Sequence, residues 1–174
     1  MKQREERATE PRRIKSNALK NHPFLQRLPY VLVILSFLGF LDALYLTLNH
    51  YQNAVPPCSL AHGCETVLTS QYASVGPVPI ALIGVFYYLA LLILSVLYLQ
   101  GKRGLPDSAS QRQAGTVGRF MAFLVVSGLV VSAILFYLQA AVIHAFCQYC
   151  LASEAIILLF FISYFLMPRE KAVE

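Results

Sequence analysis

The sequence predicts an all-α polytopic membrane protein, a bundle of four transmembrane helices with both termini in the cytoplasm. Two features of the composition favour this class: 57% of the 174 residues are hydrophobic and only 13% are charged, about half the charge of an average soluble domain. A soluble fold of this length and composition would leave large apolar patches in contact with water. The third feature is the grouping of the apolar residues into four long runs.

Each run is long enough to cross a bilayer, which takes about 20 helical residues for about 30 Å of hydrocarbon. The runs cover residues 30–48, 80–99, 120–142 and 151–167, the last extending back to Cys147. The second and third contain no charge, whereas the first contains Asp42 and the fourth contains Glu154. We therefore predict three parts, which are an N-terminal tail of residues 1–29, a four-span domain of residues 30–168 and a C-terminal tail of residues 169–174.

The basic residues predict the orientation of the bundle. All 14 Lys and Arg residues lie in three segments, with eight before residue 30, four in 100–119 and two after residue 167. The segments 49–78 and 143–146 contain none. Because basic loops stay in the cytoplasm, both tails and a plain connector at 101–118 should lie there. We attribute the net charge of +5 to this asymmetry and to contact with membrane lipid, and we expect no nucleic-acid partner.

Four cysteines form two closely spaced pairs on the predicted outer side, Cys58 with Cys64 and Cys147 with Cys150. Disulfides persist in the oxidising space outside the cytoplasm. Cys147 and Cys150 open the fourth span, where residues three apart share a helix face. The unpaired N–H groups of a first helical turn stabilise a thiolate. This arrangement is typical of a redox-active pair.

The other pair needs a bend in the chain. Cys58 and Cys64 would be about 9 Å apart in a straight helix, beyond the Cα separation of about 7 Å that a disulfide allows. Pro56, Pro57 and Gly63 surround them and favour a bend. A pair on an outer loop above a pair at the membrane edge suits an electron relay. The loop pair would accept electrons from a water-soluble protein, and the inner pair would deliver them into the bilayer.

Longer motifs surround both cysteine pairs. The first outer loop reads Cys58-Ser-Leu-Ala-His-Gly-Cys64-Glu-Thr-Val-Leu-Thr-Ser70-Gln-Tyr72-Ala-Ser-Val-Gly76-Pro-Val-Pro79, followed by Gly84 and Tyr88. The first span contains Asp42-Ala-Leu-Tyr45-Leu-Thr47, and the fourth opens on Cys147-Gln-Tyr-Cys150. Over residues 28–168 these motifs resemble the vitamin K epoxide reductase family.

The resemblance implies a quinone-dependent thiol-disulfide oxidoreductase of the bacterial type, in the inner (cytoplasmic) membrane, with its active site facing the periplasm or exterior. Cys147 and Cys150 would be the redox centre of a bundle built around ubiquinone or menaquinone, with Cys150 facing the quinone. Cys58 and Cys64 would shuttle electrons from a thioredoxin-like partner, which is thereby reoxidised for disulfide formation. Many bacterial relatives carry that partner as a fused domain. We expect a separate protein on the outer side, because these 174 residues contain no such domain.

Four further residues are assigned to the quinone pocket: Asp42, Ser70, Tyr88 and Glu154. Ser70 belongs to the family's small polar set near the site. Asp42 and Glu154 are the only charged residues in the spans, where such residues are costly unless they pair or serve a site. Glu154 lies one turn after Cys150, where it can hydrogen-bond a quinone oxygen and transfer a proton. Animal members have a Tyr at this position, so we do not expect vitamin K epoxide to be the substrate.

Simpler interpretations are also open. Asp42 and Glu154 can make packing hydrogen bonds, and Tyr88 and Phe86 can fill a helix interface instead of lining a pocket. The four cysteines can form structural disulfides or a four-thiolate zinc site in a non-catalytic membrane protein. The disulfide bond protein B family also has four spans and two cysteine pairs, but it places the pairs in the reverse order.

The topology generates the first prediction. A reporter fused after Glu174 should stay in the cytoplasm, and one inserted near Gln52 should be exported, because the basic residues flank the spans on one side only. Paired fusions to a phosphatase that is active only outside the cytoplasm would measure this. The reverse pattern would remove the cysteines from the oxidising compartment and contradict the redox interpretation.

Overall fold

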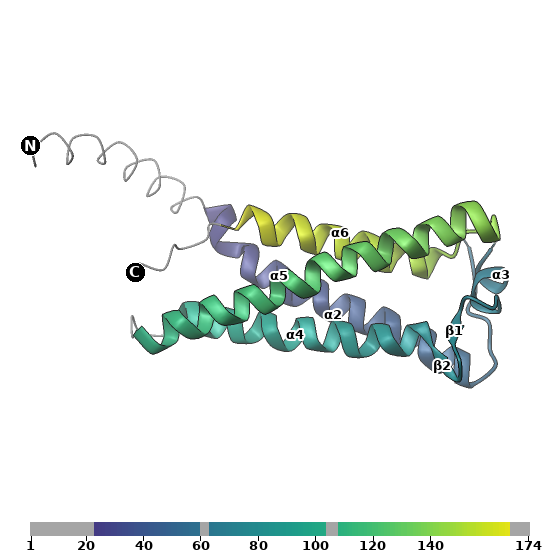
Figure 1. Cartoon of the computed structure of the whole chain (residues 1–174), viewed down its shortest axis with the longest axis horizontal. Coiled ribbons are helices and arrows are strands. Elements are labelled where there is room, and N and C mark those ends of the chain that lie inside the picture. Colours follow the sequence, from purple (N-terminus) through teal and green to yellow (C-terminus); the bar gives the residue numbers. More distant parts are fainter. Residues whose placement is uncertain (1–22, 60–62, 104–107, 168–174) are drawn as a thin grey trace, which may run out of the picture.

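Four long helices run side by side in the computed structural model, which describes residues 23–59, 63–103 and 108–167 (Figure 1). The helices are α2 (Pro23–Tyr51), α4 (Ile80–Arg103), α5 (Ser108–Tyr137) and α6 (Gln148–Leu166). Each contributes to a segment long and apolar enough to cross a membrane, with a mean hydropathy between 2.0 and 2.6. The predicted class, an all-α bundle of four membrane-spanning helices, is confirmed.

The helices extend beyond the apolar runs that predicted them. Helix α4 continues to Arg103 and α5 begins at Ser108, so most of the connector predicted for residues 101–118 is helix, and the prediction of a plain connector was wrong there. The local sequence explains the extension, because Ser is favoured at a helix start and the Ala, Gln and Arg residues that follow are good helix formers. Helices α4 and α5 therefore continue past their apolar runs at the end of the bundle where they are connected to each other.

The packing of the bundle is a closed ring, in which α2 and α5 each pack against both α4 and α6. The core contains large side chains from all four helices that are fully buried: Leu32, Leu91, Met121, Val125 and Phe160. The outward faces carry exposed aromatic residues, among them Phe86, Phe120 and Phe123, which are 64%, 63% and 70% exposed. Such a surface is stable only against an apolar solvent, so the outer faces of the bundle fit a lipid environment.

Six polar side chains inside the bundle make hydrogen bonds to helix backbone. Three tyrosine hydroxyls each donate to a backbone carbonyl on another helix, at 2.6–2.9 Å: Tyr87 to Leu124, Tyr88 to Ser153 and Tyr164 to Gly118. Ser36, Thr47 and Ser95 donate instead to the carbonyl four residues earlier in their own helices. Unsatisfied polar groups are costly in hydrocarbon, so the tyrosine bonds also hold the relative positions of α4, α5 and α6.

A small cap covers one end of the bundle. It contains helix α3 (Cys64–Leu68) and an antiparallel hairpin of β1 (Ser74–Val75) and β2 (Val78–Pro79). The hairpin turn places Gly76 at a φ of 61°, a left-handed conformation that glycine adopts without steric cost. Figure 1 shows the cap at the end opposite the start of α2 and the end of α6. Both cysteine pairs therefore lie at the capped end.

A close contact between α2 and α4 generates the second prediction. Gly39 lies against the ring of Tyr88, and a β-carbon at Gly39 would overlap that ring. The ring is only 4% exposed and its hydroxyl is bonded to Ser153, so it has no room to move away. Gly39→Ala should lower stability by about 1–3 kcal/mol, measured as a lower Tm in detergent.

Gly115→Ala is the matched control. Gly115 is exposed on α5 with open space around it, and alanine is the better helix former. The control should leave Tm unchanged or raise it. Equal losses of Tm in the two variants would contradict the role of Gly39.

Candidate active site

Cys147 is the N-cap of α6. Its backbone is extended, with φ −101° and ψ 121°, and its Sγ accepts a hydrogen bond from the backbone N–H of Cys150 at 3.4 Å. A hydrogen bond with the Cys150 side chain lowers the pKa of Cys147 to about 7, assisted by the backbone N–H groups of Cys150 and Tyr149 and opposed by burial. The lowered pKa favours the thiolate of Cys147, and the thiolate is the nucleophile in disulfide exchange.

The loop pair is joined. Cys58 and Cys64 form a disulfide with their Cα atoms 6.0 Å apart, so the chain makes the bend predicted from Pro56, Pro57 and Gly63. Cys64 opens α3 and is fully buried, whereas Cys58 is only partly buried. The two sulfurs of this loop therefore differ in their access to solvent.

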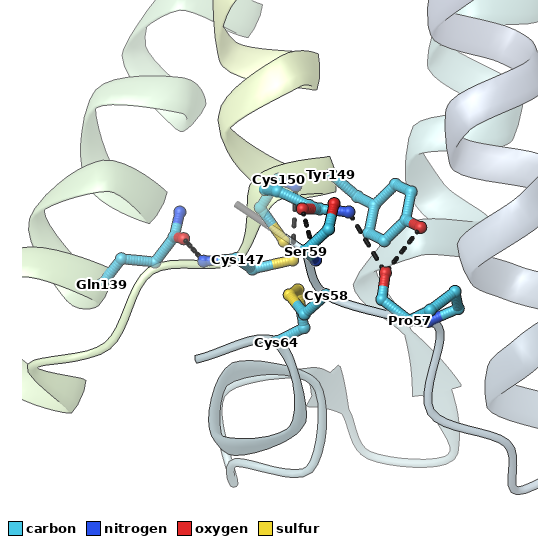
Figure 2. Close-up of a disulfide and its surroundings, with 9 residues drawn as sticks. Pro57, Cys58, Ser59, Cys64, Gln139, Cys147, Tyr149 and Cys150 are labelled. Carbon is cyan, nitrogen blue, oxygen red and sulfur yellow. Dashed lines mark hydrogen bonds between the residues drawn. A yellow bond between two sulfur atoms is a disulfide. The ribbon is translucent and has the colours of Figure 1, made fainter. Parts of the chain in front are cut away.

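The two cysteine pairs meet in one cluster. Cys64 and Cys147 belong to the same buried hydrophobic group, and Cys58 and Cys150 pack against it. Figure 2 shows the loop disulfide beside Cys147, with Cys150 behind it in the first turn of α6. Cys147 and Cys150 are free thiols. The structure thus joins into one centre two pairs that the sequence placed only on the same side of the membrane.

Gln139 is a site residue that sequence reasoning missed. It is 3% exposed, and its two amide atoms have different partners. Its Oε1 accepts the backbone N–H of Cys147 at 2.9 Å, and its Nε2 donates to Oε1 of Glu154 at 2.9 Å. Gln139 therefore connects the reactive cysteine to the carboxyl group in α6. The available signal was that Gln139 is the only amide side chain in the apolar run of residues 120–142, where polar groups need partners.

A local irregularity positions Gln139. It lies in a π-helix, η1 (Leu138–Ile143), that follows α5. His144 ends this segment in the left-handed conformation with φ 55°, and the Ala145 N–H donates to the Gln139 carbonyl at 3.1 Å. Single π-helical turns occur frequently at functional sites. Here the turn brings Gln139 and Cys147, which are eight residues apart, into direct contact.

A cavity of about 530 Å³ lies between the capped ends of the four helices and the cap. Its lining includes all four residues assigned to the quinone pocket, which are Asp42, Ser70, Tyr88 and Glu154. Cys150 and Gln139 also line it. Cys147 is not part of the lining. The two cysteines of the inner pair therefore face different neighbours, since Cys150 borders the cavity and Cys147 contacts the loop.

The polar groups of the lining differ in their engagement. Oδ2 of Asp42 is buried and has no hydrogen-bond partner among the described residues. Glu154 accepts a bond from Gln139. The hydroxyl of Tyr88 is bonded to Ser153, and the hydroxyl of Ser70 donates to the Val67 carbonyl at 2.7 Å. Asp42 thus borders the cavity as a residue, while its buried Oδ2 has no partner among the described residues.

Tyr88 both fills a helix interface and lines the cavity, so the two interpretations of this residue hold together. Its side chain is buried between helices, which fits the packing interpretation, and it also borders the cavity. Phe86 does neither, because it is 64% exposed on the outer face of α4.

The model of the vitamin K epoxide reductase family matches residues 30–165. The match covers most of the chain, including both cysteine pairs and every lining residue named above. It agrees with the four apolar helices and with the disulfide in the segment between α2 and α4. The chain belongs to the vitamin K epoxide reductase family, and it is an oxidoreductase of the membrane.

Proposed function

We propose that this chain is a thiol:quinone oxidoreductase that reoxidises a thioredoxin-like protein. Electrons would pass from that protein to Cys58 and Cys64, then to Cys147 and Cys150, and finally to a membrane quinone. One observation carries the proposal: the loop disulfide packs against Cys147, while Cys150, three residues further along, borders a cavity inside the bundle. A single dithiol–disulfide exchange would thus carry electrons from the loop pair to the pair that borders the cavity.

The first transfer occurs between the loop pair and its protein partner. The partner's dithiol attacks the loop disulfide, forms its own disulfide and leaves Cys58 and Cys64 as thiols. The partial exposure of Cys58 supports its role in this exchange, since Cys64 is fully buried. The outer side of the inner membrane suits this step, because a disulfide persists there.

The second transfer occurs between the two pairs. A loop thiolate attacks the Cys147 sulfur of an inner disulfide and releases Cys150 as a thiolate. The second loop cysteine then displaces Cys147, which restores the loop disulfide. Two electrons and two protons have then moved from the loop to the inner pair. The burial of Cys64 beside Cys147 supports Cys64 as the attacking residue, and the structure has the disulfide arrangement that follows this step.

The cavity fits a quinone headgroup. Its volume of about 530 Å³ lies within the range of about 300–1,000 Å³ for small-molecule sites, and its lining includes the polar residues Asp42 and Glu154. A quinone bound there accepts two electrons and two protons. Cys150 borders the cavity and is placed to supply the electrons, and Glu154 is placed to supply a proton. Gln139 orients Glu154 through its amide N–H and orients Cys147 through its carbonyl.

The third prediction tests the electron path with purified protein. Changing both Cys58 and Cys64 to Ala should abolish quinone reduction by a reduced thioredoxin-like donor, because the relay is gone. Some quinone reduction by a small dithiol should remain, because Cys147 is buried under the intact loop disulfide and loss of that disulfide opens a path for a small reagent. Absorbance of the quinone measures both rates.

Cys150→Ser is the companion variant and should lose activity with both donors. Equal loss of both activities in the loop variant would refute the relay. Stoichiometric metal in the purified protein would favour the alternative, a non-catalytic metal-binding protein.

The fourth prediction concerns Glu154. Glu154→Gln keeps the size of the side chain and an oxygen that can accept the Gln139 bond, but it cannot transfer a proton. Turnover should fall about a hundredfold, the lower end of what general acid catalysis contributes, while the Cys147–Cys150 disulfide still forms. Steady-state quinone reduction, measured together with the redox state of that pair, tests this.

Glu65→Gln is the matched control. Glu65 is exposed on α3, at the same end of the bundle, and is not part of the cavity lining. The control should keep wild-type turnover. Wild-type turnover in Glu154→Gln as well would make Glu154 a packing residue.

A further inference from the structure

The two residues between Cys147 and Cys150 contact the chain next to Cys58. The carbonyl oxygen of Pro57 accepts two hydrogen bonds, one from Nε2 of Gln148 at 3.2 Å and one from the hydroxyl of Tyr149 at 3.0 Å. The backbone N–H of Ser59 donates to Oε1 of Gln148 at 3.2 Å. Residues on both sides of Cys58 are therefore bonded to the first turn of α6, as Figure 2 shows.

The Cys64 side of the loop is held by a different contact. Gly63 lies against the backbone just before Cys147, so that a β-carbon at Gly63 would be 2.8 Å from the Phe146 nitrogen and 2.9 Å from the Phe146 oxygen. Those distances leave no space for a side chain, and backbone atoms cannot rotate away. The residues next to Cys58 and the residue before Cys64 therefore both contact the chain around Cys147.

The bundle in turn supports Tyr149. Its ring packs against the ring of Tyr45 on α2, with centroids 5.3 Å apart and planes inclined at 49°. A hydroxyl on a ring held in this way has a defined position, which gives its bond to Pro57 a geometric effect on the loop. Through these two contacts, Tyr149 fixes the position of Pro57, the residue before Cys58, relative to α2 and α6.

We infer that Gln148 and Tyr149 are positioning residues that hold the loop disulfide on Cys147 during electron transfer. This inference rests on the proposed function. In the transfer, the Cys147–Cys150 bond breaks and the Cys58–Cys64 bond forms, and two electrons and two protons move to the inner pair. The exchange needs the sulfurs in contact, and the hydrogen bonds to Pro57 and Ser59 supply that contact.

The same bonds are suited to release the loop. Each lies near the surface, where water competes for donors and acceptors and the net contribution of a hydrogen bond is small. Release widens access to the loop pair, because Cys64 is fully buried and Cys58 only partly exposed in the docked loop, whereas the pair must also meet a water-soluble partner. The inner dipeptide of the Cys-x-x-Cys motif therefore sets how long the loop stays docked.

The first experiment measures docking without any quinone. In a Cys147→Ser background, which blocks internal exchange, a water-soluble phosphine reduces the Cys58–Cys64 disulfide and becomes a phosphine oxide. Adding Gln148→Glu and Tyr149→Phe removes both donors to the Pro57 carbonyl and keeps the size of both side chains. Reduction should become about tenfold faster, as expected for the loss of two ordinary hydrogen bonds.

Two further variants frame this measurement. Tyr137→Phe removes a hydroxyl from an exposed tyrosine at the end of α5, outside the cavity lining, and should leave the rate unchanged. Gly63→Ala disrupts docking from the other flank and should also accelerate reduction. A parental rate in both the double variant and Gly63→Ala would overturn the inference.

The second experiment connects docking to turnover in the protein with all four cysteines. The Gln148→Glu/Tyr149→Phe variant should reduce quinone several-fold more slowly with the thioredoxin-like donor and no more slowly with a small dithiol. Equal losses with both donors, or unchanged turnover with the protein donor, would overturn the positioning role. If the wild-type protein reduced no quinone with either donor, the proposed function would fail, and the phosphine experiment would still decide whether these residues dock the loop.

Discussion

The hydrocarbon interior of a membrane offers no hydrogen-bonding partner, so polar groups within a span must be satisfied by the chain itself. The backbone meets this requirement by forming four helices, and the side chains meet it by local and interhelical bonds. Ser36 and Ser95 bond to their own helices, and Tyr164 bonds across to α5. The described polar side chains within the core thus already have partners. The exceptional group is Asp42, a residue of the cavity lining whose buried Oδ2 has no partner among the described residues.

The same constraint explains why the chemistry lies at the capped end of the bundle. A thiolate is stable where backbone N–H groups point at it, and the first turn of a membrane helix provides such groups at the edge of the hydrocarbon. Cys147 occupies that position, and its pKa is lowered to about 7 by bonds from Cys150 and the adjacent backbone. One turn deeper, Cys150 and Glu154 border the cavity. Cys147, which packs against the loop, and Glu154, which borders the cavity, therefore lie on the same helix, with Cys150 between them.

Gln139 holds the Cys147 backbone and the Glu154 carboxyl group in fixed positions relative to each other. A glutamine amide has one accepting and one donating end, and here the ends reach the Cys147 backbone and the Glu154 carboxyl. The cysteine that packs against the loop disulfide and the acid beside the cavity are thus positioned by one side chain. The π-helical turn that brings Gln139 there interrupts a regular helix to form this connection.

The sequence alone determined the architecture and the chemical class of the site. Apolar runs of bilayer length specify four spans because the thickness of the hydrocarbon sets the number of helical residues that cross it. The spacing of the cysteines identified the two pairs. The motifs around them identified the family. Asp42 and Glu154 stood out because charge is rare in a span, and both border the cavity. These features depend on local composition and spacing, which a sequence displays directly.

Only the tertiary structure decided which groups meet. Gln139 lies in an otherwise apolar run, and its contacts require a π-helical turn that no spacing rule predicts. The extension of α5 back to Ser108 was also missed, because helix propensity was outweighed by the Gly and Pro content of the connector. The bonds from Gln148 and Tyr149 to Pro57 join residues about ninety positions apart. Such contacts follow from how the cap folds onto α6, and that arrangement depends on the packing of the whole bundle rather than on any one segment.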